Sequence, residues 1–553
     1  MLLSGADIIV RTLIEQGVEV VFGYPGGQII DVYDSLYRCQ DEIRHVLTAH
    51  EQGAVHAADG YARATGGVGT VIATSGPGAT NLVTGIAAAF LDSVPLVAVT
   101  GNVPSDQLGT DSFQEIDITG ITLPITKHNF IAGSVETLAD TIREAFRLAK
   151  SGRPGPVLID VPKDIQVAQA EFTPGEPVPA AEKQSRADVT EAVETIAQCN
   201  RPFVYFGGGV IASGAEQAVT ELAEKIDAPI GCSLMGVSGV ATEHPRFLGM
   251  QGMHGHYASS IAMHHADCII ACGVRFNDRA TGDTGRFAQG AKVIHIDVDN
   301  AEFLKTVKAA LCLRGDVGLT LARLTAALKK QERPDWWDEI RKFKAREEEQ
   351  IDHREGLVPR NIYALLNDYL TASTPVVTDV GQHQMWAAQY LRFEQTRRFI
   401  SNGGLGAMGF GMGAAIGAAL GTGERTVLVT GDGGFGMCLT ELATAVSNKV
   451  PLVILVINNG VLGMVRQFQT IWYNRHYAGT VLDRQTDFVA VAEAFGAKGA
   501  RVRSLAELQE AFDTAFAADG PFLIDCAVHR DELVLPMLPP GGSMDDIIVK
   551  VED

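Results

Sequence analysis

The sequence lacks the features that would place a protein in a membrane or beside a polyanion. No uninterrupted apolar run reaches the length of a membrane span. Basic residues are scarce, since 45 Lys and Arg stand against 66 Asp and Glu, for a formal net charge of −21. Such an acidic chain repels nucleic acid and anionic lipid, so we expect neither as a partner. The first residues also lack a basic stretch and a cleavage site, and we expect no targeting segment.

Cysteine is sparse and follows no ligand pattern. The eight cysteines are scattered, several lie inside apolar runs such as DCIIACGV, and no CxxC pair occurs. This spacing argues against both a disulfide framework and a zinc site. We therefore expect reduced core thiols in a soluble, cytoplasmic protein.

The sequence does contain enough apolar material for several cores. Of its 553 residues, 46% are hydrophobic and 20% are charged. Apolar strands alternate with helical stretches in three segments, residues 1–165, 186–330 and 358–553. This alternation predicts an α/β protein with three doubly wound parallel-sheet domains. The predicted strands are VEVVFG, IRHVLTA, TVIATSG, PLVAVTG and PVLIDVP, then PFVYFGGGV, DCIIACGV and KVIHIDVD, then VVTDVG, TVLVTGD, LVILVINN and FLIDCAV.

Two stretches of different composition separate these segments. Residues 166–185, QVAQAEFTPGEPVPAAEKQS, are rich in Pro, Ala and Glu and predict a linker. The second stretch, RPDWWDEIRKFKAREEEQIDHREGLVP, carries dense alternating charge. It predicts a solvated helix that tethers the second segment to the third.

The most informative stretch joins two strands of the third segment. One apolar run ends in GDGG at residues 431–434, a helix is predicted over residues 437–447, and a second apolar run ends in Asn458-Asn459. Ligands bind beyond the carboxyl ends of such parallel strands, and glycines there admit a phosphate group. Asp432 and Asn459 supply the oxygen donors that Mg2+ prefers. The stretch predicts a site for a metal-bound diphosphate.

The spacing of this stretch makes the prediction sharper. A GDGG turn alone is weak evidence, because Gly-Asp-Gly occurs in many surface turns. Here, however, residues 434–457 separate GDG from NN. This arrangement resembles the thiamine diphosphate (ThDP) motif of the ThDP-dependent enzymes.

A glutamate in the first segment is the first candidate catalytic residue. Glu51 comes where the strand IRHVLTA gives way to the helix AVHAADGYARATG. From this stretch alone, a first-turn glutamate favoured by the helix dipole is equally good an interpretation. The succession GYPGG, HEQGA, GYARATG and ATSGPGATN, however, resembles the pyrimidine-binding domain of the ThDP family. In that family such a glutamate shares a proton with N1′ of the aminopyrimidine, which is general acid-base catalysis through the cofactor.

Further motifs narrow the resemblance to one branch of that family. Together, and along nearly the whole chain, they are similar to the catalytic subunits of the acetolactate synthase (acetohydroxyacid synthase) family. The resemblance implies condensation of two 2-keto acids with loss of CO2, at the start of branched-chain amino acid biosynthesis. Two pyruvates would give 2-acetolactate, and pyruvate with 2-ketobutyrate would give 2-aceto-2-hydroxybutyrate. The motifs are GTDSFQEID, TKHNF, GMHGHYA, GVRFNDRATG, VGQHQMWAAQ, GLGAMGFG and NNGVLGMVRQFQ.

The resemblance also implies roles for individual residues. The residues implied to contact ThDP are Val380, Gly381, Gln382, His383, Gly406, Met408, Gly431, Asp432, Gly433, Gly434, Asn459 and Met464. Those implied to bind Mg2+ are Asp432, Asn459 and Val461. Those implied to act with Glu51 in catalysis are Gln114 and Lys127, and those implied to bind substrate are Phe113, Arg275, Phe468 and Gln28.

Without the resemblance, several of these residues have plainer interpretations. Phe113 and Met408 are typical of core packing, Lys127 of a solvated charge, and Arg275 of a surface ion pair. With it, the guanidinium of Arg275 becomes a clamp for the acceptor carboxylate, because a planar fork matches a carboxylate at two points. Met408 becomes the bulky residue that supports a bent cofactor.

The second segment resembles the FAD-binding domain of the same family. Three consecutive glycines after a strand are a weak signal of a phosphate loop without a full GxGxxG. With GMHG, GVRFNDR and HIDVD they imply an FAD site, although the overall reaction has no net redox change. The residues implied are Gly207, Gly208, Gly209, Met253, His254, Gly273, Arg275, Arg279 and Asp297.

Three positions depart from the family pattern. Phe468 stands where a tryptophan usually shapes the acceptor pocket, which leaves the preference for 2-ketobutyrate open. Gln28 replaces a small alanine near the same channel. Asn277 stands in a motif that commonly reads RFDDR, where it removes one charge near the expected flavin.

Other functions remain as alternatives. A pyruvate oxidase-like enzyme would use ThDP and flavin to oxidise pyruvate, and a scaffold would bind the cofactor without catalysis. Another carboligase that does without such a glutamate is disfavoured by Glu51. The resemblance also implies a homodimer or a dimer of dimers, with a possible small regulatory subunit.

Overall fold

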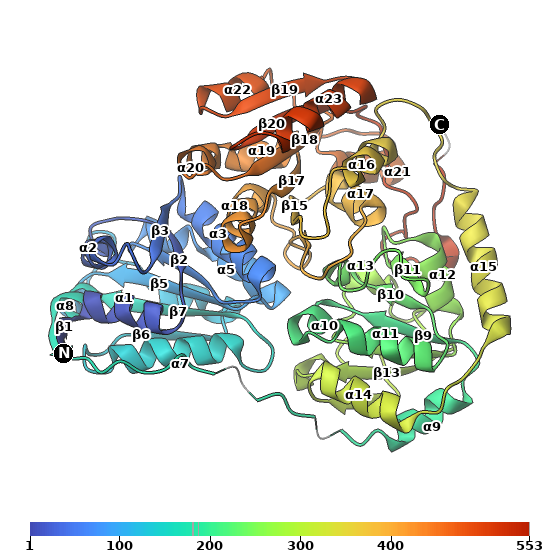
Figure 1. Cartoon of the computed structure of the whole chain (residues 1–553), viewed down its shortest axis with the longest axis horizontal. Coiled ribbons are helices and arrows are strands. Elements are labelled where there is room, and N and C mark those ends of the chain that lie inside the picture. Colours follow the sequence, from blue (N-terminus) through green and yellow to red (C-terminus); the bar gives the residue numbers. More distant parts are fainter. Residues whose placement is uncertain (180–181, 186, 552–553) are drawn as a thin grey trace.

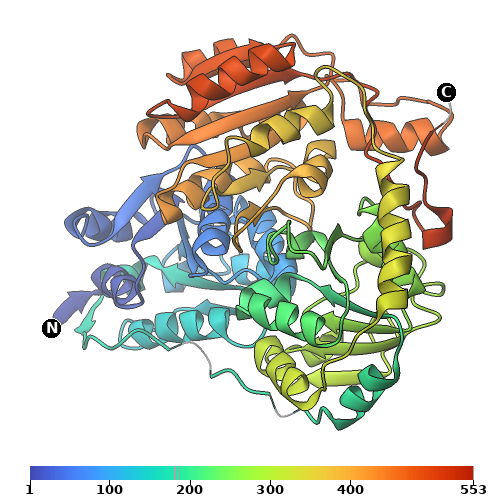
Figure 2. The ribbon, with the colours of Figure 1, turned by 45° about the vertical axis from the view of Figure 1, so that its right-hand side comes forward.

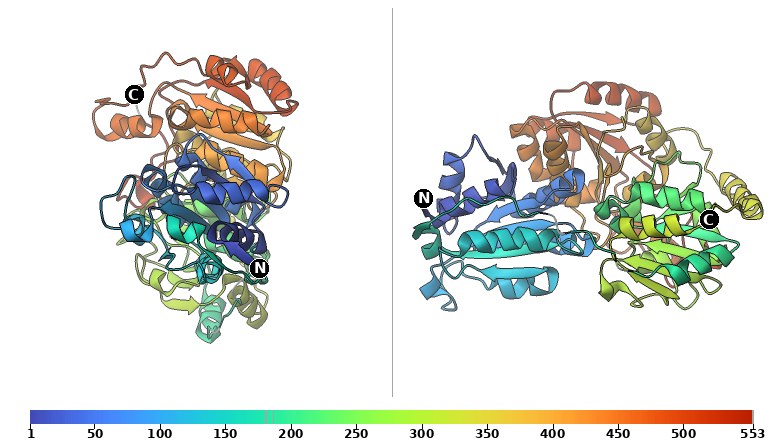
Figure 3. Two further views of the ribbon diagram at one scale, coloured as in Figure 1. Left: turned by 90° about the vertical axis from the view of Figure 1, so that its left-hand side faces the viewer. Right: turned by 60° about the horizontal axis from the view of Figure 1, so that its bottom comes forward.

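Three parallel sheets, each of six strands, follow one another along the chain (Figure 1). The computed structural model describes residues 1–179, 182–185 and 187–551. The first and middle domains lie side by side, and the third lies across both (Figure 3). Helices cover both faces of each sheet, so the prediction of three doubly wound α/β domains is confirmed.

The first sheet has the strand order β3-β2-β4-β5-β7-β6. Its central strands are buried along their whole length, as expected for runs of Val, Ile and Ala covered on both faces. A short β1 pairs antiparallel with β8 beside this sheet. The elements are β1 Leu2–Ser4, α1 Gly5–Glu15, β2 Val20–Tyr24, α2 Ile30–Arg38, β3 Arg44–Leu47, α3 Glu51–Thr65, β4 Gly69–Ala73, α4 Pro77–Thr80, α5 Val83–Asp92, β5 Leu96–Asn102, α6 Ile118–Thr122, β6 His128–Ile131, α7 Leu138–Lys150, β7 Pro156–Pro162, α8 Lys163–Val167 and β8 Gln169–Glu171.

The middle sheet has the order β11-β10-β9-β12-β13-β14, in which the connections reverse direction between β9 and β12. This is the strand order of dinucleotide-binding domains, which bind their ligand at that reversal. The elements are α9 Thr190–Gln198, β9 Pro202–Phe206, α10 Gly208–Ser213, α11 Glu216–Lys225, β10 Ile230–Cys232, β11 Phe247–Met250, α12 Tyr257–His265, β12 Cys268–Cys272, α13 Asp278–Thr281, β13 Lys292–Asp297, β14 Leu311–Arg314, α14 Val317–Ala327 and α15 Pro334–Glu348.

The third sheet has the order β16-β15-β17-β18-β20-β19, the same pattern as the first sheet. The elements are α16 Pro359–Asn367, β15 Val376–Thr378, α17 Gln382–Tyr390, β16 Phe399–Ile400, α18 Phe410–Thr422, β17 Thr426–Gly431, α19 Asp432–Cys438, α20 Leu442–Ser447, β18 Leu452–Asn458, α21 Gly463–Trp472, α22 Phe488–Ala494, β19 Lys498–Val502, α23 Leu505–Phe516 and β20 Phe522–Ala527, with a 3-10 turn, η5, at Leu439–Glu441.

Helices α3 and α18 join the first domain to the third. Both are rich in Gly and Ala, and α18 is buried on nearly all sides. Their backbones approach closely, because a Cβ atom at Gly413 would lie 2.6 Å from the carbonyl oxygen of Gly53, and one at Gly417 would overlap the carbonyl oxygen of Ala57. Small residues therefore fix the relative position of the two domains.

Several sequence predictions needed correction. The helix predicted over residues 437–447 starts earlier, at Asp432, and is interrupted by η5. The predicted linker, residues 166–185, is ordered at its start in α8 and β8, while residues 180, 181 and 186 lie outside the described residues. The charged stretch forms α15 along the outer side of the middle domain (Figure 2), but Trp336 and Ile340 bury one face of it. The domain borders at residues 165, 186, 330 and 358 stay predictions.

Other expectations hold in the residues that the structure describes. No helix there combines the length and apolar composition needed to cross a membrane. All eight cysteines have free thiols, and most of them are buried, although Cys312 is exposed.

Candidate active site

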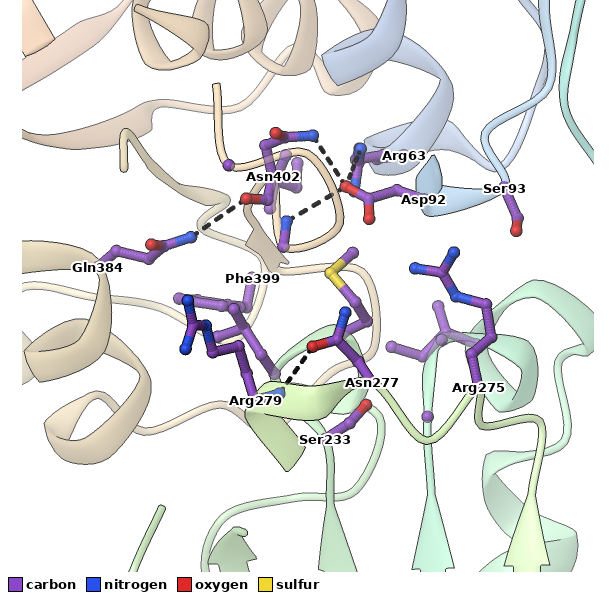
Figure 4. Close-up of a pocket in the computed structure, with 18 of the residues that line it drawn as sticks. Arg63, Asp92, Ser93, Ser233, Arg275, Asn277, Arg279, Gln384, Phe399 and Asn402 are labelled. Atoms are coloured by element: carbon purple, nitrogen blue, oxygen red, sulfur yellow. Dashed lines mark hydrogen bonds and ion pairs between the residues drawn. The ribbon is translucent and has the colours of Figure 1, made fainter. Parts of the chain in front are cut away.

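A cavity of about 850 Å3 lies where the three domains meet. Its wall comes from the loops that follow β9 and β12 in the middle sheet and β15, β17 and β18 in the third sheet. The first domain closes one side with residues 93–95 and 152–154, which precede β5 and β7. The cavity thus faces the carboxyl ends of two sheets and the amino end of the first. Figure 4 shows side chains from all three domains around it.

The GDGG turn lies at one end of this cavity. Asp432 opens α19 directly after β17, and its side chain is buried. Burial raises the pKa of this carboxyl group to about 6, although backbone N–H groups, including that of Asn459, partly offset it. A Cβ atom at Gly433 would press on Leu462, and one at Gly434 would lie 2.6 Å from Asp379. The turn therefore needs glycine to keep the space in front of the helix open.

His383 lies opposite this turn with an unpartnered ring atom. It follows β15, the strand that pairs with β17. Its ring is buried, and its Nε2 has no hydrogen-bond partner among the described residues. Burial lowers the pKa of His383 to about 4, so the imidazole is neutral at neutral pH. A buried ring nitrogen next to Gly431 and facing the cavity is suited to a polar ligand group.

Asn459 completes this end of the cavity. Its Oδ1 accepts a hydrogen bond from the N–H of Val461 at 3.1 Å, and its Nδ2 donates to Oε1 of Gln382 at 3.4 Å. Gln382 in turn donates to Gln467 and to the carbonyl of Glu532. These bonds fix the orientation of the Asn459 amide. Within the described chain no group of three His, Cys, Asp or Glu side chains could hold a metal ion, so a metal here needs oxygen atoms from a phosphate group.

Asp379 holds the helix that carries the loop with Gly406 and Met408. Its buried carboxylate accepts from the N–H groups of Val380, Gly409 and Gly411, at 2.7 to 3.1 Å. The N-terminus of α18 is thereby tied to the end of β15. Met408 consequently lies against the GDGG turn, with its Cε 3.5 Å from a Cβ atom built on Gly433.

The same loop is held from the first domain by a buried network (Figure 4). Asp92 accepts from Arg63 at 3.0 Å, from Nδ2 of Asn402 at 2.9 Å, and from the N–H groups of Gly403 and Gly404. Arg63 also pairs with buried Asp59 and donates to the carbonyl of Ser401. The network ties the cavity loop to α3 and α5 of the first domain.

The middle domain contributes a close approach of two glycine loops. The N–H of Gly209 donates to the carbonyl of Gly273 at 3.1 Å. A Cβ atom at Gly207 would lie 2.6 Å from the same oxygen, and one at Gly209 would lie 2.7 Å from the Cα of Gly273. These loops end the neighbouring strands β9 and β12, where the connections of this sheet reverse. The position is the usual site for a dinucleotide.

Buried polar atoms without partners line this part of the cavity. Both amide atoms of Gln251 and Nδ1 of His254 have no hydrogen-bond partner in the described structure. Asp297, at the end of β13, is also buried, and burial raises its pKa to about 6. Together they suit a polar heterocycle with a ribose.

Arg275 extends into the cavity between the first and middle domains (Figure 4). No carboxylate of the described residues forms a hydrogen bond or ion pair with its guanidinium, and burial lowers its pKa. Arg279 lies along Met253 instead, and Asn277 accepts a hydrogen bond from the N–H of Arg279 at 2.9 Å. Asn277 is thus the N-cap of α13, a position that Asn and Asp fill equally well.

Helix α21 closes the cavity from the third domain. Met464 and Phe468 both face it. The ring of Phe468 packs on Trp472 with 4.9 Å between the ring centroids, so its position is fixed from one side. The aromatic side chain is therefore available to shape a bound substrate.

Glu51 lies elsewhere, at the carboxyl end of the first sheet. It opens α3, is nearly buried, and accepts a hydrogen bond from Nδ2 of Asn81 at 2.9 Å. Gln114 lies beside Gly76 in the same region, the carbonyl of Gln28 lies against Gly101, and Phe113 is 83% exposed. None of these side chains reaches the cavity. The cavity faces the amino end of this sheet, whereas Glu51 lies at its carboxyl end, so Glu51 does not line the cavity that Asp432 lines in the same chain.

Three sequence models of thiamine pyrophosphate enzymes match consecutive parts of the chain. The N-terminal TPP binding domain matches residues 3–121, the central domain residues 189–324, and the C-terminal TPP binding domain residues 379–526. Each range falls within one of the three domains, although β6 and β7 lie beyond the first range and β15 lies just before the third.

Known proteins match over the whole chain. The acetolactate synthase large subunit of Corynebacterium glutamicum is 44% identical over 99% of this chain and 90% of its own length. Acetolactate synthase isozyme 2 large subunit of Escherichia coli K12 is 42% identical over 99% and 100%, and the probable acetolactate synthase large subunit of Methanocaldococcus jannaschii is 42% identical over 100% and 96%. The chain belongs to the acetolactate synthase large-subunit family. Its cofactor is therefore thiamine diphosphate, for which it carries both binding domains.

In this acetolactate synthase relative, Lys127 is not among the residues that line the cavity. It lies near the cavity rim beside Gly155, but its ammonium group donates to the carbonyls of Leu148 and Ser151 at the end of α7. Burial and the nearby cations Arg147 and Arg153 lower its pKa to about 8. In this conformation Lys127 caps a helix and does not line the cavity.

Some residues that hold this synthase-type site together carry no motif that the sequence patterns indicate. Arg63 and Asp92 were not singled out, although they stand in GYARATG and FLDSVP next to recognised motifs. A buried charge within an apolar helix is the signal that could have found them. The hydrogen bonds of Asp379 to the start of α18 give it a structural role.

Proposed function

We propose that this protein condenses two 2-keto acids with loss of CO2, forming 2-acetolactate from pyruvate in branched-chain amino acid biosynthesis. The observation that carries the proposal is the cavity that joins the GDGG turn to the unpaired guanidinium of Arg275. The turn suits a diphosphate, and the guanidinium suits the carboxylate of a keto acid. The names of the relatives favour this reaction over the oxidase alternative.

Thiamine diphosphate supplies the electron sink for decarboxylation when it is bound. The chain's own residues bind and orient it. Gly431 to Gly434 and the first turn of α19 would hold its diphosphate, His383 and Met408 would contact its body, and Glu51 would hold a proton at N1′. Burial of the cavity floor excludes water from the reacting atoms.

Mg2+ would bind at the GDGG end. Asp432, the oxygen of Asn459 and the carbonyl of Val461 offer hard oxygen donors, and diphosphate oxygens would complete the coordination. Burial raises the pKa of Asp432 and so disfavours its ionised form. A bound cation would offset this effect, because it favours the ionised carboxylate.

FAD would occupy the middle-domain part of the cavity. The touching glycine loops at Gly207–Gly209 and Gly273 leave room for its pyrophosphate, and Asp297 is placed for a ribose hydroxyl. Gln251 and His254 would pair with polar atoms of the ring. Asn277, which replaces the usual Asp, still caps α13, so this replacement gives no reason to expect loss of the proposed FAD site.

Arg275 would clamp the carboxylate of the acceptor keto acid, and Phe468 would bound the space for its alkyl group. Gln28, Phe113 and Gln114 would meet the substrate from the opposite side, together with Glu51. Lys127 would reach the cavity only after leaving the carbonyls of α7.

A second copy of the chain would complete the site. Exposed apolar side chains gather near both half-sites: Tyr24, Phe113 and Leu123 on the first domain, and Met437 and Tyr473 on the third. Faces of this kind are typical of protein interfaces. A homodimer would bring Glu51 of one copy to the GDGG turn of the other, and two dimers could associate. A small regulatory subunit is a further partner in keeping with relatives named large subunits.

The test is product analysis with pyruvate, thiamine diphosphate, Mg2+ and FAD while dissolved oxygen is followed. We expect acetolactate and CO2 with negligible oxygen consumption, and a much lower but measurable rate of product formation in Glu51→Gln. Oxygen uptake matched to decarboxylation without acetolactate would instead establish the oxidase. Sedimentation of the same sample would show the dimer, and a monomer with full activity would contradict the shared site.

A further inference from the structure

A buried carboxylate of the third domain reaches the backbone just before Glu51. Glu441 ends the 3-10 turn η5 and is 1% exposed. Its Oε1 accepts from the N–H of His50 at 3.0 Å, and its Oε2 accepts from the N–H of Ala49 at 3.2 Å. The hydroxyl of Thr444 donates to Oε2 at 2.6 Å. Both carboxylate oxygens therefore accept hydrogen bonds. Two of the three donors, the backbone N–H groups, belong to the first domain.

The carboxylate of Glu441 is tightly packed against the start of α3. A Cβ atom at Gly53, in the first turn of α3, would overlap the carboxyl group of Glu441. The contact lies beside the close approach of α3 and α18 at Gly53 and Gly413. Burial raises the pKa of Glu441, while its three donors and nearby His50 favour the ionised form.

We propose that Glu441 is a positioning residue for Glu51: its carboxylate fixes the two peptide groups that lead into α3 and so sets the direction of the Glu51 side chain. The two N–H groups precede the helix and have no helical partner of their own, so a carboxylate is the natural acceptor for them. The interruption of the helix at η5 is what turns Glu441 toward them.

The inference also connects the two half-sites of one chain. Asp432 opens the segment that Glu441 closes, so the residue proposed for the metal and the residue that orients the glutamate belong to one short stretch. The inference rests on the role proposed for Glu51, and the experiment separates the two.

The first measurement is amide hydrogen exchange on the unliganded protein. Glu441→Gln keeps the shape but turns its amide NH2, a donor, toward one of the backbone N–H groups, so we expect exchange at residues 49–54 to become at least about tenfold faster. The matched control is Asp160→Asn. Asp160 is a buried carboxylate of the first domain, which also holds residues 49–54, and it accepts hydrogen bonds from Thr100 and Asn102. It should leave exchange at residues 49–54 unchanged. If Glu441→Gln does not fold, Thr444→Val removes one donor and keeps the charge, and the same exchange is measured.

The second measurement is a double-mutant cycle in kcat with pyruvate. Glu441→Gln alone should lower kcat about tenfold with an unchanged KM, and should have no further effect in the Glu51→Gln background, because it acts through Glu51. An equal loss of kcat in both backgrounds, or unchanged exchange at residues 49–54, would overturn the inference while the proposed function stands. Full activity of Glu51→Gln would overturn the proposed function itself and, with it, the positioning role.

Discussion

Substitution of Gly417 by alanine tests the contact that fixes the first domain on the third. The added Cβ would overlap the carbonyl oxygen of Ala57 and lie 2.9 Å from the backbone nitrogen of Tyr61, both in α3. Since the obstacle is backbone, α3 and α18 must separate. Overpacking of this kind costs about 3 kcal/mol. Alanine regains about 0.5–1 kcal/mol of helix propensity, which leaves about 2 kcal/mol of net destabilisation.

The assay is thermal unfolding by calorimetry, read as the shift of the transition because a protein of three domains need not unfold in two states. About 2 kcal/mol corresponds to a decrease in Tm of roughly 4–8 °C for domains of this size. Gly133→Ala is the control, since a Cβ atom there would meet nothing within 4 Å. A Tm of Gly417→Ala equal to or above that of the wild type would refute the close packing of α3 against α18.

Three further predictions concern buried charges. Burial raises the pKa of Asp160 to about 6, so the native state loses stability as pH rises from 4 to 7 and this carboxyl group must ionise. The Tm of Asp160→Asn relative to that of the wild type should therefore rise over this range. A Tm difference that stays constant with pH would contradict this expectation. Asp92→Asn weakens four hydrogen bonds, one of them to Arg63, and should destabilise the fold by about 2–3 kcal/mol, seen as a lower urea midpoint, whereas exposed Glu144→Gln should change it little. Arg275→Lys loses a two-point contact and should raise KM for pyruvate roughly tenfold at unchanged Tm; an unchanged KM would remove Arg275 from the substrate site.

The predicted strands except β3 lie inside their sheets, and the missed strands are mostly edges, with β10 the interior exception. Runs such as LVILVIN are buried on both faces, so their apolar composition alone indicates a strand. Five missed strands lie at the edges of the sheets and are short or partly exposed: β6, β11, β14, β16 and β19. Short half-polar runs carry no periodic signal in the sequence.

The candidate site divides in the same way. Residues just beyond strand ends were found, because a strand followed by glycines or by Asp and Asn has a local signature. The contacts between residues of different domains have no such local signature in the sequence. The separation of Glu51 from Asp432 depends on which edge of the first sheet meets the cavity, and the helix-capping position of Lys127 depends on α7 packing beside β6.

The first and third sheets share one strand order, and this explains why the site has two halves. The strand β4 before ATSGPGAT and the strand β17 before TGDGG hold the same place in their sheets, and α3 and α18 follow the equivalent strands β3 and β16. The equivalent helices pack on each other. The two domains differ in where they carry an acid. The third has Asp432 in the glycine turn after β17, whereas the turn after β4 has none. The first has Glu51 at the start of α3, whereas α18 starts without one. Each domain thus carries one half of the proposed chemistry, and the proposed dimer would join the halves that one chain keeps apart.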